Sequence, residues 1–162
     1  MTNRISIDSA SEQQTIAIGK ALGAMLRPGD IVSLIGDLGS GKTRLAKGII
    51  SQALKVPIDE VNSPSFTIVN RYEGPFTIDH ADLYRVGYGA VEELGLMETI
   101  DENGAILIEW ASDEAPISDS ELRVTFSIGD DEDSRLIEFT YMIPGAWSAR
   151  LTETFFSALS MK

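Results

Sequence analysis

The stretch 31-IVSLIGDLGSGKTRLAKGII-50 joins an apolar run to a glycine-rich loop and then to a helical pattern. Residues 31–35 are apolar and rich in β-branched side chains, as expected for a strand buried on both faces. The following residues match the phosphate-binding pattern G-x-x-x-x-G-K-[ST], and residues 42–54 have the pattern of a helix. Strand, loop and helix in this order predict a P-loop.

The residue types in this loop suit phosphate chemistry. Glycines let the backbone turn so that successive N–H groups point at phosphate oxygens, and the start of the next helix adds its dipole. Lys42 is expected to reach the β- and γ-phosphates, and the Thr43 hydroxyl to bind Mg²⁺. The predicted nucleotide contacts are Gly36, Asp37, Leu38, Gly39, Ser40, Gly41, Lys42, Thr43 and Arg44. Guanine-specific switches carry Asn-Lys-x-Asp, which this sequence lacks, so ATP is the expected nucleotide.

P-loop enzymes also hold Mg²⁺ with an acid at the end of a neighbouring buried strand. The apolar run 105-AILIEW-110 ends in Glu109, and 75-PFTIDHADLYR-85 offers Asp79 and Asp82. An acid at the carboxyl tip of a buried parallel strand points into the crevice where open α/β sheets bind ligands. We therefore predict Glu109 as the Mg²⁺ ligand beside Thr43. Asp82 is expected to orient the attacking water or reach the metal through water, with a turn aspartate as the alternative.

Several further residues leave two interpretations open. His80, the only histidine, is either structural or catalytic. Arg71 or Arg85 either stabilises charge in the reaction or forms a surface ion pair. Tyr84 and Trp110 either stack on a base or fill the edge of the core. The segment 62-NSPSF-66 is either a γ-phosphate-sensing switch or a simple loop.

Strand and helix patterns alternate along the chain. Strands are expected at 5–8, 31–35, 66–72, 75–80, 105–110, 121–128 and 134–142, with hairpins at Glu73-Gly74 and around the acidic turn 129–133. Helices are expected after a capping box of Ser9 and Glu12, at 42–54, at 89–98 and at 146–159. The prediction is a single P-loop ATPase domain over residues 1–162, an α/β three-layer sandwich with a mixed sheet of about seven strands flanked by helices.

Composition narrows the function classes. The net charge is −12, and segment 111–140 alone holds nine acidic residues and two arginines. Proteins that hold nucleic acid by themselves usually present a basic face, so direct RNA or DNA binding is not expected. No apolar run approaches the ~18 residues of a membrane span, no export signal is visible, and cysteine is absent. A cytoplasmic location is expected. The run 129-GDDED-133 is typical of a solvated turn, or alternatively of a surface for a basic partner.

Four motifs in order, GDLGSGKT, NSPSFTIVNRY, HADLYR and ILIEW, resemble the TsaE (formerly YjeE) family. This family is the bacterial ATPase component of the machinery that makes threonylcarbamoyladenosine next to the anticodon of tRNA. The resemblance covers nearly the whole chain, although the C-terminal third matches only in size and strand pattern. It implies that Thr43 and Glu109 bind Mg²⁺, that Lys42, Asp82 and Glu109 serve catalysis, and that Ser11 approaches the adenosine.

The resemblance also implies a switch and a partner. The switch or partner-facing residues would be Ser63, Pro64, Ser65, Phe66, His80, Tyr84, Arg85 and Trp110. Two positions depart from the family pattern: Ser40 stands where alanine is more usual, and Ser65 where threonine is. Family members dock on a heterodimer of two ASKHA-type subunits (TsaB and TsaD type), contact tRNA only indirectly, and reset that complex by hydrolysing ATP. No membrane is involved.

Two rival functions fit a P-loop chain of this length. One is a small-molecule kinase, which would need an arginine-bearing lid over the phosphates, whereas the arginines after Trp110 are widely spaced among acids. The other is a nucleotide-gated binding module that barely hydrolyses ATP. Turnover with and without partner proteins separates these from a partner-dependent ATPase.

Overall fold

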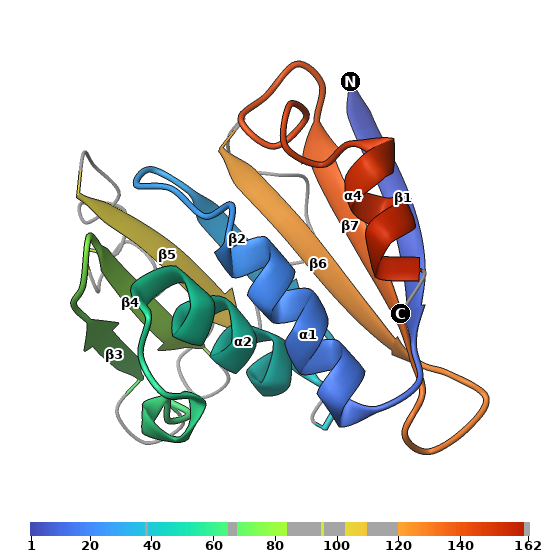
Figure 1. Cartoon of the computed structure of the whole chain (residues 1–162), viewed down its shortest axis with the longest axis horizontal. Helices are drawn as coiled ribbons and strands as arrows, with labels where there is room; N and C mark the ends of the chain where they lie inside the picture. Colours follow the sequence, from blue (N-terminus) through green and yellow to red (C-terminus); the bar gives the residue numbers. More distant parts are fainter. Residues whose placement is uncertain (38, 65–67, 84–94, 96–102, 110–119, 161–162) are drawn as a thin grey trace.

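The computed structural model describes residues 1–37, 39–64, 68–83, 95, 103–109 and 120–160. Its strands form one mixed seven-stranded sheet in the order β1-β7-β6-β2-β5-β4-β3 (Figure 1). The strands are β1 (Thr2–Ser9), β2 (Ile31–Ile35), β3 (Val69–Tyr72), β4 (Thr77–Asp82), β5 (Gly104–Glu109), β6 (Glu121–Ile128) and β7 (Arg135–Met142). The pairs β6–β2, β2–β5 and β5–β4 are parallel, and the pairs β1–β7, β7–β6 and β4–β3 are antiparallel. The predicted mixed sheet and both predicted hairpins are confirmed.

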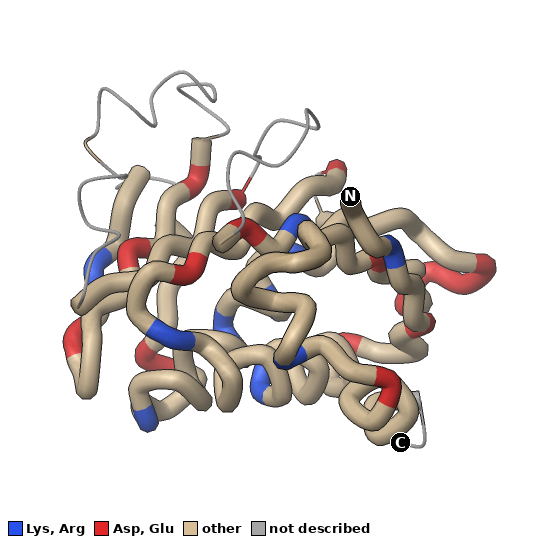
Figure 2. The backbone as a smooth tube through the Cα atoms, turned by 90° about the horizontal axis from the view of Figure 1, so that it is seen from above, with Lys and Arg blue, Asp and Glu red and all other residues tan. Residues whose placement is uncertain are grey.

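Within the described residues, three helices cover one face of this sheet. They are α1 (Glu12–Gly23), α2 (Lys42–Leu54) and α4 (Glu153–Ser160), and a short 3₁₀ turn η1 (Ile58–Glu60) follows α2. Figures 1 and 2 together show these helices on the same side of the sheet. The segment 89–98, expected to be helical, lies outside the described residues. None of the described helices is long and apolar enough to cross a membrane.

Helices α1 and α2 pack almost backbone to backbone. A side chain on Gly48 of α2 would collide with the carbonyl oxygen of Ile16 in α1, and one on Gly19 with that of Leu45. Glycines at these positions allow the close approach, and the largest core cluster of apolar side chains fills the space between both helices and the sheet. As a result, the start of α1 lies beside the start of α2, where the P-loop ends.

The first helix begins two residues later than predicted. Ser9 is the last residue of β1, and its hydroxyl bonds to that of Thr15 at 2.7 Å. Ser11 is the N-cap instead, since its hydroxyl accepts the N–H of Gln14 at 3.1 Å. The capping pair is therefore Ser11 and Gln14, and the prediction of Ser9 with Glu12 was wrong because β1 extends through Ser9.

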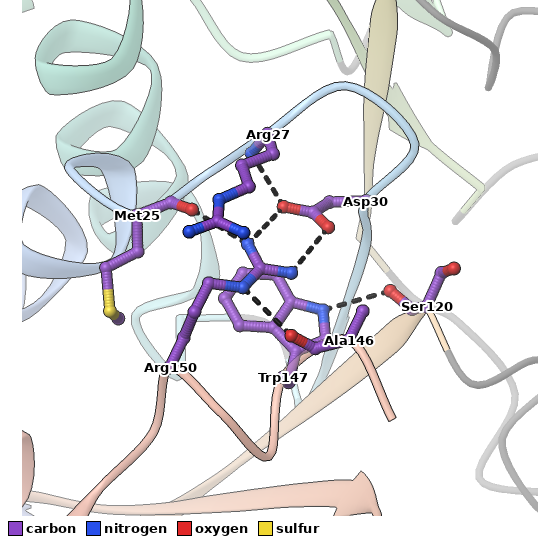
Figure 3. A network of polar contacts seen from close by, with 7 residues as sticks. All are labelled: Met25, Arg27, Asp30, Ser120, Ala146, Trp147 and Arg150. Atoms are coloured by element: carbon purple, nitrogen blue, oxygen red, sulfur yellow. Dashed lines mark hydrogen bonds and ion pairs between the residues drawn. The ribbon is translucent and has the colours of Figure 1, made fainter. Parts of the chain in front are cut away.

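The last helix is also shorter than predicted, because tertiary contacts hold residues 145–151 in turns. Trp147 is fully buried and its indole N–H donates to the Ser120 carbonyl at 2.9 Å. Arg150 stacks on the Trp147 ring at 4.0 Å and pairs with Asp30 through two hydrogen bonds of 2.7 and 2.8 Å (Figure 3). These contacts join the C-terminal segment to the residue just before β2, and α4 begins only at Glu153.

Candidate nucleotide-binding site

The predicted P-loop lies between a buried strand and a helix. β2 is buried over its first four residues, and α2 begins at Lys42. Gly39 and Gly41 have φ angles of 79° and 109°, in the left-handed region that glycine adopts without strain. Gly41 is the N-cap of α2, and no side chain caps that helix. The N-terminus of a helix favours an anionic ligand through its N–H groups and dipole.

Lys42 folds back over this loop. Its ammonium donates to the carbonyl oxygens of Gly36 and, at 3.1 Å, Asp37. Burial lowers the pKa of Lys42 below its ordinary value, although the nearby carboxylates, Glu109 first among them, act in the opposite direction. A buried ammonium at the start of α2 is placed to meet phosphate oxygens.

The predicted Mg²⁺ ligands touch each other. The Thr43 hydroxyl donates to Oε1 of Glu109 at 2.9 Å, and Glu109 ends the interior strand β5 with 2% of its surface exposed. Nε2 of His80 lies 2.5 Å from Oε2 of the same carboxylate. Since one neighbour binds each carboxylate oxygen, Glu109 is held in a single orientation.

The Glu109 carboxyl is ionised despite its burial. Burial by itself raises its pKa. The hydrogen bond and charge of His80 outweigh this effect, and with smaller contributions from Thr43 and Lys42 the pKa of Glu109 lies below its usual range. A buried carboxylate beside a hydroxyl is a suitable donor pair for a hard divalent cation.

Asp82 joins these groups through the register of the sheet. It is the last residue of β4, and it stands directly opposite Glu109 in the parallel β4–β5 pair. On the other side of β5, Leu34 near the end of β2 stands opposite Glu109 in the parallel β2–β5 pair. The loop, Glu109 and Asp82 therefore meet at the carboxyl edge of adjacent parallel strands, where ligands bind in open α/β sheets.

These groups line an open pocket of about 300 Å³. Its walls come from the loop and the start of α2, from α1, from the segment after η1, from the ends of β4 and β5, and from the β6–β7 hairpin. The lining residues are Glu12, Thr15, Gly39, Ser40, Gly41, Lys42, Thr43, Arg44, Ser63, Asp82, Glu109, Asp133 and Arg135.

The donor set fits Mg²⁺ bound together with a nucleotide. Within the described ranges, no group of three or more His, Asp or Glu side chains could hold a metal by itself. Mg²⁺ typically takes one or two carboxylates and completes its shell with phosphate oxygens and water. Thr43 and Glu109 match that pattern, so these two residues would hold the ion.

A family model described as Threonylcarbamoyl adenosine biosynthesis protein TsaE matches residues 9–137. The chain belongs to the TsaE family. The tRNA threonylcarbamoyladenosine biosynthesis protein TsaE of Bacillus subtilis (strain 168) is 38% identical over 135 residues, which make up 82% of each chain. The protein of the same name from Nostoc sp. (strain PCC 7120) is 37% identical over 139 residues, 81% of this chain and 82% of that relative.

A solved structure agrees with this family. The crystal structure of Bacillus subtilis YdiB superposes with a TM-score of 0.71 at 29% identity, covering 99% of this chain and 97% of that one. The α/β fold of this chain is thus that of the TsaE family.

Of the remaining predicted site residues, some lie at the pocket, some lie elsewhere, and some fall outside the described residues. Ser63 lines the pocket and Pro64 is buried beside it, whereas Leu38, Ser65, Phe66, Tyr84, Arg85 and Trp110 lie outside the described residues. His80 is fully buried, which excludes a partner-facing position and directs it at Glu109 instead. Arg71 forms a bidentate pair with Asp79 at 2.8 and 3.0 Å, the surface ion pair that was the alternative to a catalytic role.

Ser11 is occupied as the N-cap of α1, and its approach to adenosine stays a prediction. Its neighbours Glu12 and Thr15 line the pocket from the first turn of that helix. Sequence reasoning missed both, as well as Asp133 and Arg135. Local patterns carried no signal for the last two, because only the position of β6 beside β2 brings the β6–β7 hairpin to the loop.

Proposed function

We propose that the chain is a Mg²⁺-dependent ATPase that serves threonylcarbamoyladenosine biosynthesis in tRNA, slow alone and stimulated by partner proteins. The observation that carries the proposal is the 2.9 Å contact between the Thr43 hydroxyl and Glu109 at the mouth of a P-loop pocket. Membership of the TsaE family supports the place in tRNA modification, because the curated relatives are named for that pathway.

Each residue has a defined task in this proposal. The loop N–H groups and Lys42 bind the phosphates of ATP. In the transition state of hydrolysis they stabilise the negative charge that develops on the ADP leaving group. Thr43 and Glu109 hold the Mg²⁺ ion, which supplies electrostatic stabilisation when bound. Asp82, opposite Glu109, accepts a hydrogen bond from the attacking water and orients it at the γ-phosphate.

Slow turnover by the isolated chain is expected because the arginines that the structure describes near the pocket already have partners. Arg71 is paired with Asp79, and the Arg135 guanidinium is bound to main-chain carbonyls. Arg44 is half exposed and pairs with Glu12 at 3.7 Å. Among the described residues, these contacts leave Lys42 as the cation placed for the transferred phosphoryl group. A partner that completes the site would accelerate hydrolysis.

The partner we propose is the heterodimer of TsaB-type and TsaD-type ASKHA subunits, with ATP as the nucleotide. Acidic residues cluster at the tip of the β6–β7 hairpin, and basic residues are spread along the rest of the described backbone (Figure 2). A net charge of −12 does not favour direct tRNA binding. Ser63 and Asp82 line the pocket. We propose that a γ-phosphate biases partner affinity through the segments that begin with these residues, 63–66 and 82–85.

The test is a comparison of ATP and ADP with the purified partner. Calorimetry should show tighter association of the heterodimer in ATP than in ADP, by roughly 5- to 150-fold for an ordinary coupling, and phosphate release should accelerate on mixing. Absence of a complex in both nucleotide states, with the heterodimer shown to be active, contradicts the partner. Rapid phosphorylation of a small acceptor by the chain alone would instead support a kinase.

A further inference from the structure

Arg135, the first residue of β7, reaches the phosphate-binding loop from the opposite end of the chain. Its Nε donates to the carbonyl oxygen of Ser40 at 3.0 Å, and its Nη2 to that of Gly39 at 3.1 Å. Its Nη1 donates to the carbonyls of Glu132 at 2.5 Å and Ser134 at 2.8 Å. In the described part of the chain, this guanidinium thus bridges two main-chain segments.

All four described partners of the Arg135 guanidinium are main-chain carbonyl oxygens. Four acidic residues, 130–133, stand two to five positions before this arginine in the hairpin, yet no ion pair joins Arg135 to a described carboxylate. A planar guanidinium presents several N–H donors in a fixed fork, which suits adjacent acceptors better than an ammonium does. The geometry is therefore that of a clamp on two consecutive peptide groups, not of a charge pair.

The fold explains how the clamp reaches its target. β6 runs parallel beside β2, with Thr125 opposite Ile35, the residue before the loop. The hairpin then returns with Arg135 opposite Ile128. The first residue of β7 consequently lies over the loop, although the bonded residues are 95 and 96 positions apart in sequence.

Clamping these two carbonyls fixes the orientation of the loop's peptide groups. In a trans peptide, the C=O and the following N–H point in opposite directions. The two clamped peptides lie between Gly39 and Gly41, whose positive φ angles glycine can exchange for negative ones at little cost. An added side-chain carbon on Gly39 would meet nothing within 4 Å, so close packing does not hold the loop at that residue.

A flipped peptide here would be damaging for phosphate binding. Turning the Ser40–Gly41 peptide over would put its carbonyl oxygen where the Gly41 N–H now stands, and a negative dipole would face the anion. The Ser40 N–H is already held by the Asp37 carbonyl at 3.0 Å, which fixes the preceding turn. Arg135 restrains the carbonyl side of that Gly39–Ser40 peptide and also the carbonyl of the Ser40–Gly41 peptide.

We propose that Arg135 is a positioning residue, which holds the Gly39 and Ser40 carbonyls outward and so keeps the loop in its phosphate-binding form. This inference rests on the proposed function, because it takes the loop to bind a nucleotide. Arg135 acts through the loop backbone, and its contribution is present before any ligand arrives.

The test compares Arg135→Lys and Arg135→Ala with wild type for binding of Mg²⁺–ADP by calorimetry. Lysine keeps the charge but cannot bond both carbonyls with the same fork, so both variants should bind about tenfold more weakly or worse. Arg4→Ala is the matched control. Arg4 is an exposed arginine of β1 that pairs with Glu138, a residue of the same strand as Arg135. The Arg4→Ala variant should bind Mg²⁺–ADP within about twofold of wild type.

Two results would overturn the proposal. If Arg135→Lys binds like wild type while Arg135→Ala is weak, the charge acts on the nucleotide directly. If both variants bind like wild type, the clamp has no role. A wild-type protein that fails to bind Mg²⁺–ADP would refute the proposed function instead.

A second measurement needs neither a variant nor a ligand. In nuclear magnetic resonance spectra of the ligand-free wild type, the Arg135 Hε proton should exchange with water more slowly than that of Arg4, because it is bonded to the Ser40 carbonyl. Equal exchange rates for the two arginines would contradict the clamp, even if every variant at position 135 failed to fold.

Discussion

Replacing Arg150 by methionine should strongly destabilise the fold. Asp30 and the Arg150 side chain are 4% and 7% exposed, and two hydrogen bonds of 2.7 and 2.8 Å join them (Figure 3). Without the guanidinium, the Asp30 carboxylate stays buried with the Arg27 N–H, at 2.7 Å, as its remaining donor in that network. Methionine keeps an unbranched side chain at this position but loses the guanidinium that pairs with Asp30 and stacks on Trp147, so the loss is mainly electrostatic.

The size of the effect follows from the burial of both groups. Removing one partner of a buried ion pair costs about 3–5 kcal/mol, a large part of the roughly 5–15 kcal/mol that stabilises a domain. For a chain of this length the melting temperature should fall by roughly 6–20 °C. Urea unfolding followed by circular dichroism measures the free energy directly, and Arg4→Met, at an exposed pair, should change it by less than about 0.5 kcal/mol.

A double-mutant cycle separates the coupling free energy of the Asp30–Arg150 pair from the loss of packing at each position. Asp30→Asn combined with Arg150→Met should cost about 2 kcal/mol less than the sum of the single changes, because the second change removes the charge that the first leaves unpaired. A loss below about 1 kcal/mol in Arg150→Met, or strict additivity in the cycle, would refute this reasoning.

Three further predictions concern the site and the helix layer. His80→Phe removes the donor to Glu109 and should weaken Mg²⁺ binding about 10- to 100-fold, with partial recovery in His80→Gln; unchanged metal affinity by titration would contradict a positioning role. Gly48→Ala should lower the melting temperature by several degrees, roughly the effect of 1–3 kcal/mol of overpacking, because the new methyl collides with the Ile16 carbonyl; a melt equal to wild type would argue against the close helix contact. Because folding lowers the pKa of Glu109 from its unfolded value near 4.5, the ionised carboxylate contributes to the free energy of unfolding above that pH, and the contribution is lost as the pH falls further. The free energy of unfolding in urea should therefore exceed that of Glu109→Gln by less at pH 3 than at pH 6. A difference that stays constant over this range would contradict the lowered pKa.

The parts of the molecule that sequence predicted well are those governed by short-range patterns. The P-loop helix was predicted at 42–54 and lies at Lys42–Leu54, because glycine, lysine and threonine at fixed spacing permit one backbone path. Glu109 was placed at a strand tip by its apolar run, and the structure puts it there, in contact with Thr43. Turn signals likewise located both hairpins.

The parts that sequence missed depend on long-range order. Arg135 looked like one arginine among acids, and only the strand order β6-β2 brings it to the loop. The residues alone left His80 open as structural or catalytic, and the family resemblance implied a switch or partner-facing position. In the structure His80 is buried on β4, between β3 and β5, and contacts Glu109. The last helix was predicted too long because Trp147 and Arg150 have helical spacing but are held by Ser120 and Asp30. Tertiary anchors overrode local propensity there.

The most direct test of the Thr43–Glu109 site is Mg²⁺-dependent ATP hydrolysis by Glu109→Gln. Lys42 and the loop amides remain in this variant, so ATP should still bind with much of its wild-type affinity, while partner-stimulated phosphate release falls to background. Asp82→Asn should also be slow. Wild-type turnover in Glu109→Gln, measured with saturating Mg²⁺ and ATP, would contradict the assignment of this carboxylate to the metal.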